Sequence, residues 1–220
     1  MDDIQRQRGA RHLRRLEMLI DVVFALLIWD IVSTLPLPEG SDLSLAGLGE
    51  FLGGNLDLSI VIIGMVIVLN YWAQNNAHSS ELQATDSTHA LLSILQLFFL
   101  LFYTYAAALG MQFEGDEMAL ALQSLTLLLA GVLGFAAWAY AIRDSRLLAD
   151  YARQEEVTGL LVRSLAEPLT ALITLPLAFV SATIWELAWL LYIPLAWYLG
   201  RKRHALRTRF RLEQDDGAQD

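Results

Sequence analysis

The sequence contains no cysteine among its 220 residues, which excludes disulfide bonds, thiolate nucleophiles and zinc–thiolate sites. Charged residues are scarce at 18%, whereas they make up about 25% of typical soluble domains. None of the four histidines stands in a His-Glu-x-x-His pair, and no nucleophile elbow, phosphate-binding loop or dinucleotide fingerprint is present. We therefore predict that the protein is not an enzyme and binds no cofactor.

Apolar residues are abundant instead, at 55% of the chain, and the mean hydropathy is +0.44. They gather into six blocks, and a membrane-spanning helix needs about 20 predominantly apolar residues. We predict an all-α membrane protein with a single repeat of six transmembrane helices. The predicted spans are Leu16–Leu37, Leu58–Gln74, Ala90–Gly110, Met118–Ile142, Leu165–Val180 and Ile184–Gly200.

The basic residues predict the orientation of these spans. They precede the first span (Arg6–Arg15), separate the fourth from the fifth (Arg143–Arg163) and follow the sixth (Arg201–Arg211), while the segments 38–57 and 111–117 contain no lysine or arginine. Basic loops stay on the cytoplasmic side, so six spans place both termini in the cytoplasm. Residues 1–200 then form one transmembrane domain, and residues 201–220 form a cytoplasmic tail that is basic and then acidic.

Two carboxylates in the first span need a physical reason. A charge near the centre of a span costs about 2.5–3.5 kcal/mol, and Asp21 and Asp30 both fall inside this one. They are nine residues apart, which places them on opposite faces of a helix with about 100° per residue. Each one either bonds to a neighbouring helix or has a role in transport.

The same span carries a stripe at helical spacing, formed by Val22, Leu26, Trp29 and Ser33. This stripe either lines a narrow dry passage that gates by dewetting or packs against helices of the same subunit. A second polar group follows the second span, in a segment predicted as a cytoplasmic loop. It forms either a solvated loop or a hydrogen-bond network that ties the first span to the second and third; its residues are Gln74, Asn75, Asn76, His78, Glu81, Asp86 and His89.

Three stretches resemble the TMEM175 family. The run from Arg15 to Asp21 is similar to the R-x-x-x-F-S-D signature of that family's first helix, with Leu19 and Ile20 in place of Phe and Ser. The stretch Leu69–Asn76 resembles the aromatic and polar end of the second helix, and Asp86 with the apolar run Leu91–Leu101 resembles the start of the third. No Thr-Val-Gly-Tyr-Gly filter is present.

The resemblance implies a cation channel without a pore-loop filter, which assembles as a homotetramer with the first helix of each subunit lining the pore. The permeant ion would be potassium, with sodium and protons as alternatives, in a bacterial cytoplasmic membrane and without a nucleic acid partner. Leu26 matches the position of the hydrophobic constriction, and Trp29 and Ser33 follow it. Asp21 and Asp30 are then the charges of the pore helix, and a structural network would hold this helix; its residues are Arg15, Trp72, Asn75, Asn76, His78 and Asp86.

Two other functions remain open from the residues alone. A proton channel or proton-coupled transporter would use Asp30 and Asp21, because carboxylates within spans often relay protons. A membrane scaffold that conducts no ion would explain the bulky Trp29 on the stripe.

Overall fold

The computed structural model describes residues 3–33, 44, 56–113 and 115–200. Its main elements are helices: α1 (Asp3–Ser33), α3 (Leu56–Ser79), α4 (Ser87–Gln112), α5 (Glu117–Ile142), α6 (Gln154–Arg163), α7 (Ala166–Leu177) and α8 (Ala182–Ala188), with short 3-10 turns at Arg143–Ser145 and Trp189–Leu191. Within these residues the one strand-like pairing is a bridge between Leu82 and Leu148. The all-α prediction is confirmed for the described part of the chain; the predicted tail, 201–220, lies outside it.

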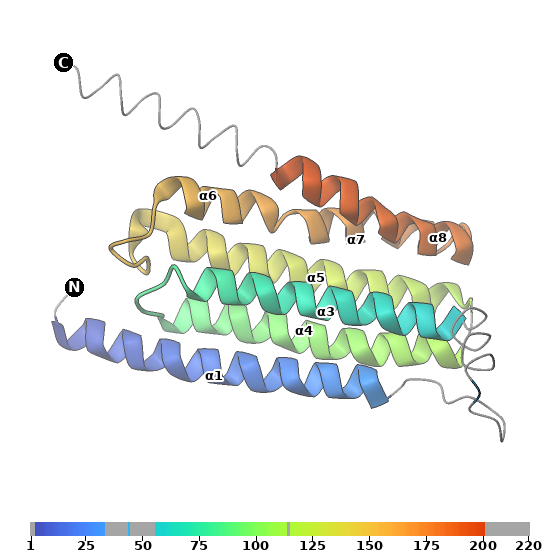
Figure 1. Cartoon of the computed structure of the whole chain (residues 1–220), viewed down its shortest axis with the longest axis horizontal. Coiled ribbons are helices and arrows are strands. Elements are labelled where there is room, and N and C mark those ends of the chain that lie inside the picture. Colours follow the sequence, from blue (N-terminus) through green and yellow to red (C-terminus); the bar gives the residue numbers. More distant parts are fainter. Residues whose placement is uncertain (1–2, 34–43, 45–55, 114, 201–220) are drawn as a thin grey trace, which may run out of the picture.

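The helices run side by side along the long axis of the molecule (Figure 1). α1 packs on α3 and α4, α4 packs on α5, and α5 packs on α7. The α3–α4 and α5–α6 connections lie at the end of the bundle where α1 begins, and the α4–α5 connection lies at the opposite end (Figure 1). Successive long helices therefore alternate in direction, as the six-span prediction requires.

Four segments of the described chain are long and apolar enough to cross a membrane: Ser87–Gln112, Glu117–Ser145, Gln154–Leu177 and Ala182–Gly200. They correspond to the last four predicted spans and support an integral membrane protein. The first two predicted spans correspond to α1 and α3, which are not among the four. α1 carries Glu17, Asp21 and Asp30 within its apolar part. The count of six spans and the cytoplasmic termini stay predictions.

Two helix boundaries differ from the predicted ones. α3 continues to Ser79, so Asn75, Asn76 and His78 lie on its last turns and not in a loop; no proline or glycine interrupts this stretch. The fifth predicted span corresponds to α7, which ends at Leu177 and is separated from α6 by a break at Ser164 and Leu165.

A proline explains the break between α6 and α7. Pro168 has no N–H to donate to Ser164, four residues earlier, and its ring would clash with that carbonyl in a continuous helix. Pro168 also packs closely on α5, because a Cβ on Gly131 would lie 2.8 Å from the Cδ of Pro168. The kink and the small residue together let α7 approach α5.

The main core lies where α1, α3, α4 and α5 meet. Phe24 and Leu27 of α1, Val68 of α3 and Leu100 of α4 are almost fully buried there. These residues fix which face of α1 turns inward, and so they determine which face remains outside.

Candidate functional site

The candidate site begins with the two faces of α1. One face is buried and has the spacing of a core-facing helix, through Leu13, Leu16, Ile20, Phe24, Leu27 and Ile31. The predicted stripe lies on the other face, where Val22 is 58%, Leu26 is 55% and Trp29 is 70% exposed. Ser33 is also exposed, and its hydroxyl donates to the carbonyl oxygen of Trp29 at 2.7 Å. The stripe is therefore not covered by the helices of the same subunit that the structure describes.

The exposed stripe continues toward the start of α1. Steps of seven residues turn a helix by about 700°, or 20° short of two full turns, and lead from Trp29 and Val22 to Arg15 and Arg8. Both arginines are exposed. The apolar stripe and a basic segment thus share one face of α1.

Asp21 and Asp30 lie at the two edges of that face, and both are exposed. Asp21 is paired with α3, since the indole Nε1 of Trp72 lies 3.4 Å from its Oδ1. Asp30 lines a small cavity of about 30 Å³ beside Gly64, Tyr103 and Thr104, which is large enough for a water molecule, since about 10–15 Å³ is needed to hold one. The two carboxylates are thus separated around the helix, as their spacing predicts.

Most of the predicted structural network does not reach α1. Asn75 is buried and its amide donates to the carbonyl of Tyr71 on its own helix at 2.9 Å, and Asn76 is exposed. His78 stacks on Trp138 of α5, with ring centroids 4.4 Å apart and planes 6° from parallel. Within the described residues, Trp72 is the member of this group whose side chain donates a hydrogen bond to α1.

Asp86 organises the end of the bundle near the start of α1. It is the N-cap of α4 and accepts hydrogen bonds from the backbone N–H groups of Thr88 and His89 at 3.1 and 2.9 Å. The Tyr140 hydroxyl donates to its other oxygen at 2.8 Å, and Arg146 lies 3.8 Å from that oxygen.

Partial burial acts to raise the pKa of Asp86, but these hydrogen bonds and the Arg146 charge outweigh it and hold the pKa below its usual value. Asp86 is therefore an ionised carboxylate whose charge is already occupied by partners of its own subunit. It does not serve as a partner for Arg15.

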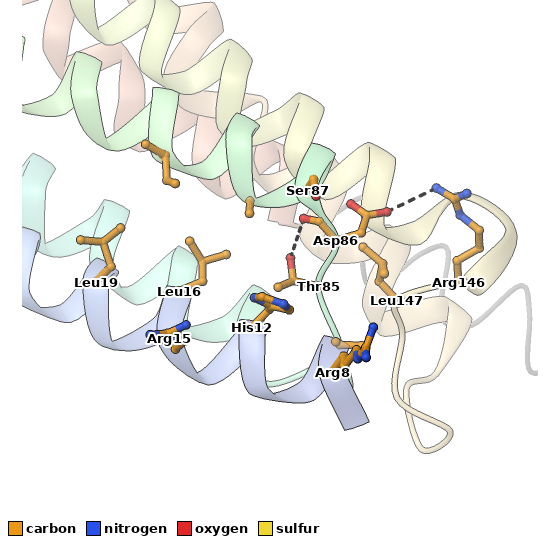
Figure 2. A pocket seen from close by; sticks show the side chains of 14 residues that line it. Arg8, His12, Arg15, Leu16, Leu19, Thr85, Asp86, Ser87, Arg146 and Leu147 are labelled. Carbon is orange, nitrogen blue, oxygen red and sulfur yellow. Dashed lines mark hydrogen bonds and ion pairs between the residues drawn. The ribbon is translucent and has the colours of Figure 1, made fainter. Parts of the chain in front are cut away.

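Arg15 forms no ion pair with Asp21 or with any other carboxylate of the described residues. Instead it lines a groove of about 650 Å³ between the start of α1 and the start of α4 (Figure 2). Arg8 and His12 line the same groove from α1, and Arg146 lines it from the α5–α6 connection. The two residues of the motif that resembles a family signature thus have different surroundings: Asp21 is bonded to Trp72 of α3, and Arg15 lines the groove.

Glu167 was not among the predicted site residues, although it is the most buried carboxylate described, at 8% exposed. It lies on α7 and accepts hydrogen bonds at Oε1 from two amides of α3, those of Asn70 and Gln74. The hydroxyls of Tyr71 and Tyr192 lie beside it. A signal existed in the sequence, since Glu167 falls within the fifth predicted span, Leu165–Val180.

A small apolar cavity of about 160 Å³ adjoins Glu167. Its walls come from α3, α5 and the apolar segment Ala182–Gly200, with Ile62, Val66, Leu127, Trp189 and Ile193 among them. No group of three histidine or acidic side chains suitable for a metal ion occurs within the described residues. The part of the chain that the structure describes offers buried polar contacts between helices and an unpartnered face on α1.

Of the comparisons with known proteins, the one with solved structures found a similar fold. No family model matches the sequence, and no curated protein matches it. The structure is similar to that of a variant of the potassium channel MtTMEM175, crystallised in complex with a nanobody–MBP fusion protein. The two share 18% sequence identity with a TM-score of 0.59, over 87% of this chain and 93% of that one. The resemblance predicted from the sequence is therefore confirmed at the level of the fold: this chain has the helical fold of a TMEM175 potassium channel subunit.

Proposed function

We propose that the chain is one subunit of a cation channel of the TMEM175 kind, that potassium is its preferred ion, and that α1 lines the pore. The observation that carries this proposal is the exposed stripe of Val22, Leu26 and Trp29 on α1, in a fold similar to that of a potassium channel. Leu26 forms the hydrophobic constriction, with Trp29 and Ser33 beyond it.

The charges on α1 support this position. Asp21 and Asp30 border the stripe and are exposed in the single subunit. Carboxylates that faced lipid would be costly, so helices that carry them normally face other helices or water. A ring of subunits around a central path gives the carboxylates both water and neighbouring helices. In such a ring the stripe faces the water-filled path, and its two edges face neighbouring subunits. Four copies is the number that the family resemblance implies.

The pore needs no filter of backbone carbonyls in this proposal. A ring of Leu26 side chains would make a narrow apolar passage that closes by dewetting. Trp29 is the largest side chain of the stripe and would narrow the path further. Its bulk favours low conductance, and it is also the observation that favours the second candidate, a membrane scaffold that conducts no ion.

Ion flux from liposomes tests the proposal. The purified protein is reconstituted with potassium inside, and potassium and proton fluxes are recorded separately, with valinomycin and a protonophore as controls for each ion. Potassium flux without ionophore is the expected result. Proton flux alone would replace the proposal with a proton pathway through Asp30. Assembled protein that passes neither ion, both as wild type and as Trp29→Ala, would support the scaffold.

A further inference from the structure

The groove beside the start of α1 has no role in the proposed pore. Its floor is the α3–α4 connection and the first turns of α4, and the α5–α6 connection closes one end (Figure 2). At about 650 Å³ it falls within the range of small-molecule sites, roughly 300–1,000 Å³. Its polar lining residues are Arg8, His12, Arg15, Thr85, Asp86, Ser87 and Arg146.

Hydrogen bonds and close packing hold the walls of the groove together. The backbone N–H of Thr85 donates to the carbonyl of Gly9 on α1 at 3.2 Å. Gly9 is required for this approach, since a Cβ there would lie 2.8 Å from the Cβ of Ala84. On the other side, the N–H of Gln83 donates to the carbonyl of Leu147 at 2.9 Å. Backbone hydrogen bonds and close packing therefore fix the relative positions of the segments that line the groove.

The charge in the groove is not balanced within the subunit. It is lined by three guanidinium groups, those of Arg8, Arg15 and Arg146, and by the carboxylate of Asp86. Arg146 is engaged with that carboxylate and donates to the Tyr140 hydroxyl at 2.6 Å. Arg8 and Arg15 have no carboxylate partner among the described residues, and His12 lies between them on α1 and lines the same groove.

Polarity changes along the groove. Past Arg15, toward the middle of the bundle, its lining becomes apolar, with Leu16 and Leu19 from α1 and Ala90 and Ile94 from α4. Leu19 is 42% and Ile94 is 44% exposed, so apolar surface remains to be covered there. The groove thus offers cations at one end and apolar walls at the other.

We propose that this groove binds an anionic phospholipid. Its phosphate sits between Arg8, His12 and Arg15, and one acyl chain follows Leu19 and Ile94. Guanidinium groups bind phosphate oxygens in pairs of parallel hydrogen bonds, and basic pockets between membrane helices are typical sites for anionic head groups. The proposal needs only a protein embedded in a bilayer, because the groove opens between α1 and α4 and its apolar end is lined by Leu19 and Ile94, not by Val22, Leu26 or Trp29.

Native mass spectrometry of the detergent-solubilised protein tests the proposal. Phosphatidylglycerol and phosphatidylcholine of equal chain length are titrated, and lipid adducts are counted for each subunit. The wild type is expected to hold one phosphatidylglycerol in preference to phosphatidylcholine. Arg8→Gln with Arg15→Gln should weaken this binding about 30-fold, because each arginine near the surface contributes about 1 kcal/mol and each 1.4 kcal/mol is tenfold.

The matched control changes the same charge on the same helix. Arg11 and Arg14 do not line the groove, although they border a neighbouring open hollow with Arg8, His12 and Arg15. Because solvent screens their charges there, Arg11→Gln with Arg14→Gln should weaken binding by less than about threefold. Ile94→Trp fills the apolar end without changing any charge. It should weaken lipid binding and leave binding of inorganic phosphate unchanged.

Three results would overturn the proposal. Equal losses in the two double arginine variants would show general attraction to basic residues and not a site. Inorganic phosphate that displaces phosphatidylglycerol at equal concentration, together with no effect of Ile94→Trp, would assign the groove to a free anion. Equal binding of both lipids to the wild type would show that the cationic end has no anionic occupant. Size-exclusion profiles of each variant confirm that it remains assembled, and ion flux is not used as a readout.

Discussion

Gln74 on α3 donates a hydrogen bond of 2.9 Å to Glu167 on α7. Asn70, one turn earlier on α3, donates to the same oxygen. This pairing joins helices that are more than ninety residues apart in sequence, since Gln74 and Glu167 are separated by 93 positions. The Glu167 carboxyl is buried, and the side-chain amides of Asn70 and Gln74 both use it as their hydrogen-bond acceptor. Without this acceptor, the two amides would lose a hydrogen bond in apolar surroundings.

Removing this acceptor should destabilise the protein. Glu167→Leu leaves two half-buried amide groups without this acceptor. Each would cost about 1–3 kcal/mol if fully buried, and water reaches part of both, so we expect a loss of roughly 2–4 kcal/mol and a clearly lower melting temperature. Glu167→Gln keeps a carbonyl oxygen that can accept from both amides, and its melting temperature should stay near that of the wild type. Thermal unfolding followed by size-exclusion chromatography measures both. If Glu167→Gln were as unstable as Glu167→Leu, the charge and not the acceptor would be what α3 requires.

The two neighbours Leu26 and Leu27 separate conduction from packing. Leu26 is 55% exposed and Leu27 is completely buried. Leu26→Ala should raise conductance by widening and wetting the constriction, with little effect on stability. Leu27→Ala should cost about 2–5 kcal/mol through the cavity that it leaves, without raising conductance per assembled channel.

Single-channel recording and thermal unfolding of the two leucine variants provide the comparison. An assembled Leu26→Ala protein with unchanged current would remove Leu26 from the pore. A rise in current in both variants would instead indicate leakage from a loosened bundle.

Asp21 and Trp72 test whether the charge at the edge of α1 acts on structure or on ions. Asp21→Asn should impair assembly or gating and leave the preference between potassium and sodium unchanged, because Trp72 already binds this carboxylate. Trp72→Phe should produce the same defect, since it removes the donor and keeps an aromatic ring. Reversal potentials and oligomer profiles distinguish the outcomes. A changed ion preference in a stable Asp21→Asn assembly, with Trp72→Phe unaffected, would place Asp21 in the ion path.

The sequence predicted the ends of a long helix well where a local signal, such as a capping residue, marks the end. The fourth predicted span began one residue after α5 and ended with it, because Asp116 caps α5 through the N–H groups of Met118 and Ala119. The exposed stripe of α1 was also found from its spacing, although the pore role of Leu26 stays a prediction. Such features depend on residues that are close in sequence.

The missed features depend on distant residues. Glu167 is buried because Asn70 and Gln74 meet it from another helix, and no local pattern shows that contact. His78 was placed in a loop, whereas α3 extends past it and its ring stacks on Trp138 of α5. The groove beside α1 similarly needs three segments, at Gly9, Thr85 and Leu147, which only the fold brings together.

The stack of His78 on Trp138 should make stability depend on pH. His78 lies four residues beyond the second predicted span, and burial, with a smaller effect of the neighbouring His89, lowers its pKa to about 3. The folded protein therefore resists a proton that the unfolded chain accepts near pH 6.5. Stability from this residue is complete above about pH 6.5 and declines as the pH falls toward 3.

Melting temperatures at pH 7.5 and pH 5 measure this dependence. Between these values the wild type should lose stability, and His78→Phe should lose less, because phenylalanine keeps a ring against Trp138 and takes up no proton. Asp86 does not confound the comparison, since its lowered pKa places its titration below this interval. Equal losses in the wild type and His78→Phe would show that the imidazole is protonated without cost, and that the stack is open to water in the folded protein.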